Sequence, residues 1–271
     1  TVESGNNRPH IELTDIEDVT IEGNGASLVF KEPLRRAIRF EGGSGVTIQN
    51  LSIDYDPVPF TQGEIIDVEN DGQKITIDLD NGYPSLSDEM FQNADRVWAS
   101  VHQPNGEFVE GIRKESSFDK FFSSFDHAGE RRFELVLRDY ISPNGLQVGN
   151  RLTIVARNTK TTVEFYQMDQ PTVENVTVHA AGGSVFAADV CSDPVFRGTK
   201  IVPPADSDRQ VASDAHGIRI VNCLSSATVE DCRHEYLLDD SVVIQHSFTS
   251  VTDILNDRTV ELEDVHPFVI G

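Results

Sequence analysis

The chain has 271 residues, 38% of them hydrophobic, which is enough to bury the core of one large domain or of one domain with an inserted module. Its 45 acidic and 22 basic residues give a formal net charge of −23, which makes nucleic acid a poor partner. No run of about 18 apolar residues is present, so a membrane-spanning helix is excluded.

The type of charge indicates the environment in which the protein works. Only six of the basic residues are Lys, and an acidic coat that favours Arg over Lys is typical of proteins from salt-loving microbes. An ordinary acidic secreted protein, including one that uses calcium, is the alternative. The chain lacks a starting Met and ends in the apolar stretch 265–271, so we interpret it as a piece of a longer protein that is secreted or held at the cell surface.

Three cysteines, Cys191, Cys223 and Cys232, are too few for a disulfide framework and have no zinc-site spacing. We therefore expect them to be small buried residues. No organic cofactor is implied, and calcium is possible without being indicated by a motif.

Short β-branched segments recur along the chain, and the first of them lie in residues 1–61. These are Val19–Gly23 and Val46–Ile53, each with apolar side chains at alternate positions. Such segments are typical of strands that bury one face. We expect residues 1–61 to form the first coils of a solenoid.

The repeat is interrupted between about residues 62 and 158. This stretch is predicted to contain a hairpin around Asn70–Gly72 and further strands at 96–102, 133–138 and 151–156, separated by loops rich in Gly, Asp and Ser. We interpret residues 62–158 as a small antiparallel β module inserted between two coils.

The repeat returns in residues 159–271, which are expected to carry the active site. Related segments begin at Pro171, Pro194 and Ala227, at intervals of 23 and 33 residues, the longer interval holding a polar insertion. Each segment is interpreted as two short strands separated by a polar turn of one or two residues at Asn or Asp. A unit of about two dozen residues that cannot bury its apolar side alone is typical of a parallel β-helix.

Solenoids present long faces that suit polymeric ligands such as carbohydrates, so carboxylates gathered on one face are the candidates for chemistry. Asp239 and Asp240 form a pair before an apolar strand, and Asp214 precedes Asp239 by 25 residues, which is about one coil. Asp214 should therefore stack close to the pair, at the strand spacing of roughly 4.8 Å or one side chain away.

Three carboxylates on neighbouring coils suit glycoside hydrolysis. One carboxylic acid must protonate the leaving oxygen while a carboxylate activates water or attacks, and mutual repulsion keeps one group protonated and another ionised. Alternatively, these residues are turn acids on an acidic surface or calcium ligands.

Other polar residues could complete a sugar site. His216 follows Asp214 by two positions, so both side chains would share one face of a strand, and His246 follows the acidic pair by six. Asp56 lies in the segment Asp54–Gly63 at the exit to the inserted module, which could contact substrate or serve as a rigid junction. His234 occupies an apolar position of the repeat and is interpreted as structural.

The chain resembles glycoside hydrolase family 110, the α-1,3-galactosidases, over nearly its whole length. The resemblance rests on Val46–Gly63, the interrupted coil after it, Val173–Gly183, Ser213–His216 and Leu238–Asp240. It implies a right-handed parallel β-helix of the pectin-lyase-like type with an inserted β-barrel-like module.

The resemblance also implies a reaction and its site. Members of the family remove terminal α-1,3-linked galactose with inversion at the anomeric carbon, and the essential acids correspond to Asp214, Asp239 and Asp240. His216, His246 and Asp56 are candidate substrate contacts. Family members are longer than this chain, and their strand after the Asp pair ends in Asn-Val-His, whereas Val242–His246 places its histidine one position later.

Two other functions remain open. A β-helix polysaccharide lyase or epimerase needs a basic residue or calcium, and from Asp214 to Asp240 the sequence contains only Arg219 and Arg233 as cations. A non-catalytic carbohydrate-binding or adhesin-like solenoid needs no catalytic acid at all. All three functions share a carbohydrate partner.

Overall fold

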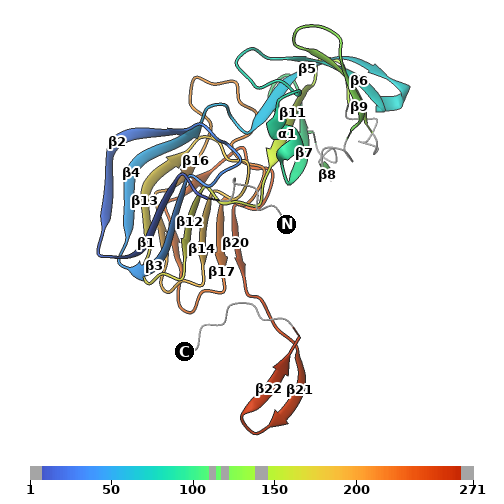
Figure 1. Ribbon diagram of the computed structural model, residues 1–271. Coiled ribbons are helices and arrows are strands. Elements are labelled where there is room, and N and C mark those ends of the chain that lie inside the picture. The colour runs from blue at the N-terminus through green and yellow to red at the C-terminus, as the bar shows by residue number, and fades with distance from the viewer. Residues whose placement is uncertain (1–7, 110–113, 117–121, 138–145, 264–271) are drawn as a thin grey trace.

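The computed structural model describes residues 8–109, 114–116, 122–137 and 146–263, and almost all of their regular elements are strands (Figure 1). The helical elements in these ranges are the short α1 (Glu89–Asn93) and η1 (Asn70–Gly72). Within the same ranges, no helix is long and apolar enough to cross a membrane. The expected all-β class is confirmed.

Two parallel sheets form the body of the molecule. The first sheet has six strands in the order β1-β3-β12-β14-β17-β20, all paired in parallel. Its strands are β1 (Ile11–Glu17), β3 (Ile38–Ser44), β12 (Val163–Tyr166), β14 (Phe186–Asp189), β17 (Ile218–Val221) and β20 (Val242–Gln245).

The repeated segments of the sequence form the second parallel sheet, in which Thr47, Thr172, Val195 and Thr228 lie in register. Its strands are β2 (Thr20–Phe30), β4 (Thr47–Tyr55), β13 (Thr172–Val178), β15 (Val195–Arg197), β16 (Lys200–Ile201), β18 (Thr228–Glu230) and β19 (Arg233–His234). The intervals predicted from the repeat are thus the intervals between neighbouring coils.

The chain visits the two sheets alternately, so its successive coils stack on one another (Figure 1). Polar corner residues bend the second sheet: Asn50, Asn175 and Asp231 have φ of 56°, 51° and 55°, a left-handed conformation that Asn and Asp tolerate. Asn175 also donates its side-chain amide to Asn50 Oδ1 at 3.3 Å. The predicted polar turns therefore act as corners of the coils.

A continuous apolar core fills the space between the two sheets. Phe40 and Phe165, on the neighbouring strands β3 and β12, are fully buried and stack with ring centroids 4.9 Å apart. Cys191 and Cys223 are buried and Cys232 is partly buried, and all three are free thiols. Burial raises the pKa of the Cys191 thiol to about 12, which fits the structural role expected of it.

The described residues between 60 and 157 form the inserted module, a curved sheet with the strand order β8-β7-β11-β5-β6-β10-β9 in which every pairing is antiparallel. Among the described residues, its two outer strands, β8 and β9, do not pair with each other. The strands are β5 (Phe60–Glu69), β6 (Lys74–Leu79), β7 (Arg96–His102), β8 (Lys114–Ser116), β9 (Phe122–His127), β10 (Arg132–Leu137) and β11 (Arg151–Arg157).

A hairpin follows the last coil. It consists of β21 (Val251–Asn256) and β22 (Thr259–Leu262), which pair with each other and stand away from the stacked sheets in Figure 1. Several large apolar residues on β20, on the hairpin and between the two are exposed, among them Ile244, Ile254 and Phe248.

A separate small core joins the inserted module to the coils. Phe60, Trp98 and Val155 of the module pack with Val58, Ala180, Val211 and Leu238. Leu238 directly precedes the Asp pair, so this core fixes the acidic corner against the module.

Candidate functional site

Three corners of successive coils lie side by side where the chain enters the first sheet. Parallel bridges join Ala181 to Ser213 and Ser213 to Leu237. The offset of 24 residues between Ser213 and Leu237 is maintained from Ile218 to Val242 in the following strands. Asp214 therefore lies level with Leu238, one position from Asp239.

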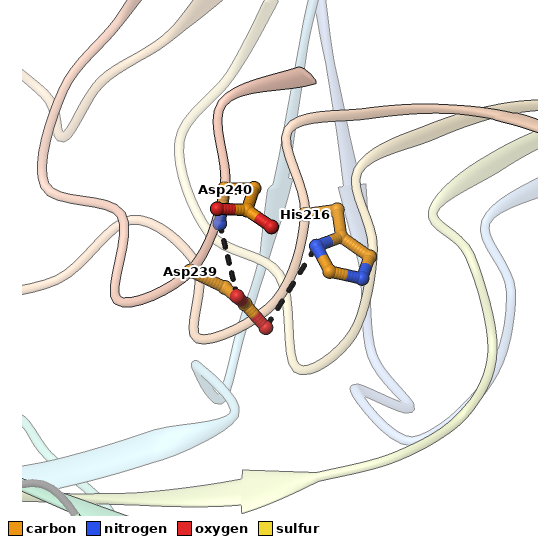
Figure 2. Close-up of side chains that lie close together, drawn as sticks. All are labelled: His216, Asp239 and Asp240. Atoms are coloured by element: carbon orange, nitrogen blue, oxygen red, sulfur yellow. Dashed lines mark hydrogen bonds and ion pairs between the residues drawn. The ribbon is translucent and has the colours of Figure 1, made fainter. Parts of the chain in front are cut away.

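Asp239, Asp240 and His216 converge at these corners (Figure 2). His216 Nδ1 lies 3.7 Å from Asp239 Oδ2, and Asp239 Oδ1 accepts a hydrogen bond from the Asp240 backbone amide at 3.0 Å. One ligand atom of each residue lies within 4.8 Å of the other two. Because like charges repel, a cation close to this pair is favourable.

The third acid lies below the surface. Asp214 is fully buried, whereas Asp239 is partly exposed and Asp240 is exposed. The candidate carboxylates thus span the range from protein interior to solvent, an arrangement that gives chemically identical side chains different environments.

The structure adds Arg157, a residue that the sequence did not indicate. Its Nε lies 4.0 Å from Asp214 Oδ2, and its Nη2 lies 3.6 Å from Asp239 Oδ2. The guanidinium carbon also lies 4.3 Å from the centroid of the Trp98 ring. The only available signal was that Arg157 ends the predicted insertion next to a coil, and nothing in that position predicts which corner it reaches.

A cavity of about 210 Å³ adjoins the cluster at the boundary between module and coils. Both parts contribute to its walls. The lining residues are Asp95, Arg96, Arg157, Asn158 and Thr159 from the module side, and Ser184, Ala215, His216, Arg219 and Gln245 from the coils. Ligand sites often lie at boundaries of this kind between two structural parts. A larger cavity of about 590 Å³ lies within the module and is lined by none of the predicted candidates.

Two predicted substrate contacts lie outside this group. Asp56 is exposed and forms an ion pair with Lys31 at 2.7 Å, and it does not line the cavity. His246 is exposed after the far end of β20, six residues from Asp240, which corresponds to roughly 20 Å of extended chain. Of the three residues predicted to contact substrate, only His216 lies close to the carboxylates.

His234 has the structural contacts expected from its place in the repeat. Its Nδ1 lies 2.8 Å from Ser241 Oγ, and its Nε2 lies 3.3 Å from Thr199 Oγ1. Burial lowers the pKa of His234, so its neutral form is favoured. The residue thereby links neighbouring coils below the acidic corner.

His216, Asp239 and Asp240 are also the residues that could hold a metal ion, since they offer one nitrogen and two carboxylate oxygens. Arg157 already faces Asp239 across 3.6 Å and would repel a cation placed there. The donor set is therefore compatible with a divalent ion but does not favour one over the guanidinium.

Asp189 gives this region a pH-dependent stability. Burial raises the pKa of its carboxyl from 3.8 to about 6, although Arg219 Nη2, 2.7 Å from Oδ2, lowers it. Between these pH values the folded state binds more protons than the unfolded state, so this contribution to stability is present at low pH and is lost as pH rises through 6.

We expect Asp189→Asn to remove that pH dependence. Relative to the parent, the free energy of unfolding of the variant should rise by at most about 3 kcal/mol between pH 4 and pH 7. This is the free energy that corresponds to a pKa raised from 3.8 to about 6. Urea denaturation at several pH values measures it, with exposed Asp193→Asn as the matched control. A constant difference between variant and parent across this range would contradict the assignment.

Comparisons with known proteins show low but extensive similarity. The chain is 23% identical to alpha-1,3-galactosidase A of Shewanella woodyi, covering 96% of this chain and 43% of that protein. It is 21% identical to alpha-1,3-galactosidase A of Bacteroides fragilis (94% and 42%) and 19% identical to alpha-1,3-galactosidase B of Akkermansia muciniphila (96% and 33%). The chain thus spans less than half the length of these relatives.

No family model matches the chain. A solved structure from Parabacteroides merdae, provisionally classed as a glycosyl hydrolase, covers 88% of the chain and 81% of its own at 12% identity, with a TM-score of 0.31. Similarity at this level does not define a fold.

Proposed function

We propose that the protein is a glycoside hydrolase that removes terminal α-1,3-linked galactose from glycans. The observation that carries the proposal is that Arg157 faces both Asp214 and Asp239, with Asp240 and His216 next to Asp239, beside a cavity of about 210 Å³. The named activity of the relatives, which align with 92–96% of this chain at 19–23% identity, supports the same reaction class.

The proposed mechanism is inverting. One carboxylic acid protonates the glycosidic oxygen while a carboxylate activates a water on the opposite face, which requires carboxyl groups about 6.5–9.5 Å apart. The nearest oxygens of Asp239 and Asp240 lie within 4.8 Å, which leaves less room than this. We therefore propose that the pair flanking the water combines Asp214 with Asp239 or Asp240.

Several finer features belong to the same proposal. We propose that the coils wind as a right-handed β-helix, the hand that parallel crossover connections almost always take. We also propose membership of glycoside hydrolase family 110, a secreted or cell-surface location, and an origin in a salt-loving microbe, which the net charge of −23 supports. The proposed reaction requires no organic cofactor, and no step of it uses calcium.

The test is a panel of galactosyl disaccharides given to the full-length protein. We expect release of galactose from the α-1,3-linked disaccharide at a rate well above that from α-1,4- and α-1,6-linked ones, and faster in molar NaCl than in dilute buffer. Treatment with EDTA should leave the rate unchanged, because no step passes through a metal ion.

Other outcomes separate the alternatives. Binding of the disaccharide without release would favour a carbohydrate-binding solenoid. Release from an acidic polysaccharide of an unsaturated product that absorbs ultraviolet light would favour a lyase. An acidic polysaccharide is included among the substrates because Arg157 adds a basic residue of the kind that a lyase needs.

A further inference from the structure

Arg157 lies where the inserted module meets two coils. It is the last residue of β11 and so ends the inserted module, yet its side chain lies between carboxylates of two different coils, with only 17% of it exposed. The distances of 4.0 and 3.6 Å to Asp214 and Asp239 exceed those of good hydrogen bonds, so the interaction is that of one charge facing two.

Trp98 packs against this guanidinium. In the antiparallel pairing of β7 with β11, Trp98 lies opposite Val155 and diagonal to Arg157, a geometry within reach of an aromatic and a long side chain. The Arg157 guanidinium carbon lies 4.3 Å from the ring centroid, and Trp98 is 4% exposed. A desolvated cation–π contact of this kind is attractive and holds the planar group in one orientation.

The backbone of the coil makes this approach possible. A Cβ atom on Gly182 would lie 2.9 Å from the Ala156 carbonyl oxygen, and one on Gly183 would lie 2.2 Å from the Lys160 carbonyl oxygen. Asn158 N donates to Gly182 O at 2.6 Å in the same place. The Gly182–Gly183 corner therefore lets the end of β11 pass closely enough for Arg157 to reach the next two corners.

We propose that Arg157 is a positioning residue through which the inserted module orders the carboxylates: held over the Trp98 ring, it fixes Asp239 relative to Asp214 and offsets their charges. This role rests on the proposed hydrolase function. The module is then part of the catalytic machinery, since its strands β7 and β11 supply the cation and the ring that holds it.

The first test is steady-state kinetics of Arg157→Ala in the full-length protein with the α-1,3-linked disaccharide. We expect kcat to fall by about a hundredfold with little change in KM, as for other losses of geometry around reacting groups. Added guanidinium chloride in the millimolar range should restore part of kcat. Arg157→Lys should have a lower kcat than Arg157→Ala with added guanidinium, because an ammonium group lacks the planar face that a guanidinium offers to an aromatic ring.

Matched variants exclude general damage. Trp98→Leu should lower kcat and Trp98→Phe should lower it less, because the latter keeps an aromatic face. Arg197→Ala, on the distant β15, should leave kcat unchanged. An unchanged kcat in Arg157→Ala, or a loss that guanidinium does not relieve, would overturn the proposal.

A measurement without substrate separates this proposal from the function on which it rests. A double-mutant cycle of Arg157→Ala and Asp239→Asn, read by thermal unfolding, should give a combined shift in Tm smaller than the sum of the single shifts. Additive shifts in Tm would contradict the proposed role of Arg157, even if the enzyme is active. Non-additive shifts in a protein that is inactive on every glycan would contradict only the hydrolase function.

Discussion

Asp239→Asn and Asp240→Asn are each expected to lower kcat for the α-1,3-linked disaccharide by about 10²–10⁴-fold, the usual contribution of a positioned acid or base. Asparagine keeps the shape of the side chain but cannot carry the negative charge or the transferable proton. One ligand atom of each of these two residues and of His216 lies within 4.8 Å of the others, so replacing either aspartate affects the same reacting atoms. Initial rates at saturating substrate measure the effect.

The control for these variants is Asp253→Asn, an exposed residue on the hairpin strand β21. It should keep the parental kcat, and all three variants should keep the parental Tm within a few degrees. Full activity in Asp239→Asn and Asp240→Asn would exclude both residues from catalysis. If the parent binds the disaccharide without hydrolysing it and the two variants lose binding, the result would instead agree with a carbohydrate-binding solenoid.

Phe165→Ala is expected to cost about 3–5 kcal/mol in the free energy of unfolding. Phe165 lies in the middle of the first sheet with no exposed surface, and its ring stacks on Phe40 at 4.9 Å and an interplanar angle of 9°. Neighbouring coils are closely packed against it on both sides, through β3 and β14, so the cavity left by the ring cannot collapse fully.

Urea denaturation followed by circular dichroism measures this cost. Val29→Ala is the matched control, because Val29 is 49% exposed and its truncation should change the free energy by less than about 0.5 kcal/mol. A cost below about 1 kcal/mol for Phe165→Ala would mean that the coils are not stacked around the core described above.

The parallel sheets could be predicted because the repeat encodes them locally. Alternating apolar residues specify which face of each strand is buried, and Asn50, Asn175 and Asp231 mark the corners by their tolerance of positive φ. The hairpin around Asn70–Gly72 was predicted for the same reason, and it joins β5 to β6.

The site could be predicted only in part. Asp214, Asp239 and Asp240 were indicated because one coil of spacing brings residues about two dozen positions apart into contact, and the observed offset of 24 places them one position out of line. His246 and Asp56 lie elsewhere because contact in a solenoid depends on the corner a residue occupies, and closeness in sequence does not determine it.

Arg157 could not be predicted from spacing. Its position depends on how the inserted module docks on the coils, through the small core that contains Trp98 and Leu238 and through the Gly182–Gly183 corner. These are tertiary contacts that join residues such as Lys160 and Gly183, 23 positions apart, or Trp98 and Leu238, 140 positions apart, and no local pattern in the sequence encodes them.

The most direct test of the central claim is a proton NMR time course of the full-length protein with galactosyl-α-1,3-galactose in molar NaCl, beside Asp240→Asn. The anomeric signals show which configuration of galactose is released before mutarotation. We expect the parent to release β-galactose first and the variant to release almost none. Early release of α-galactose would contradict the inverting mechanism, and no release by a folded parent would contradict the proposed hydrolase.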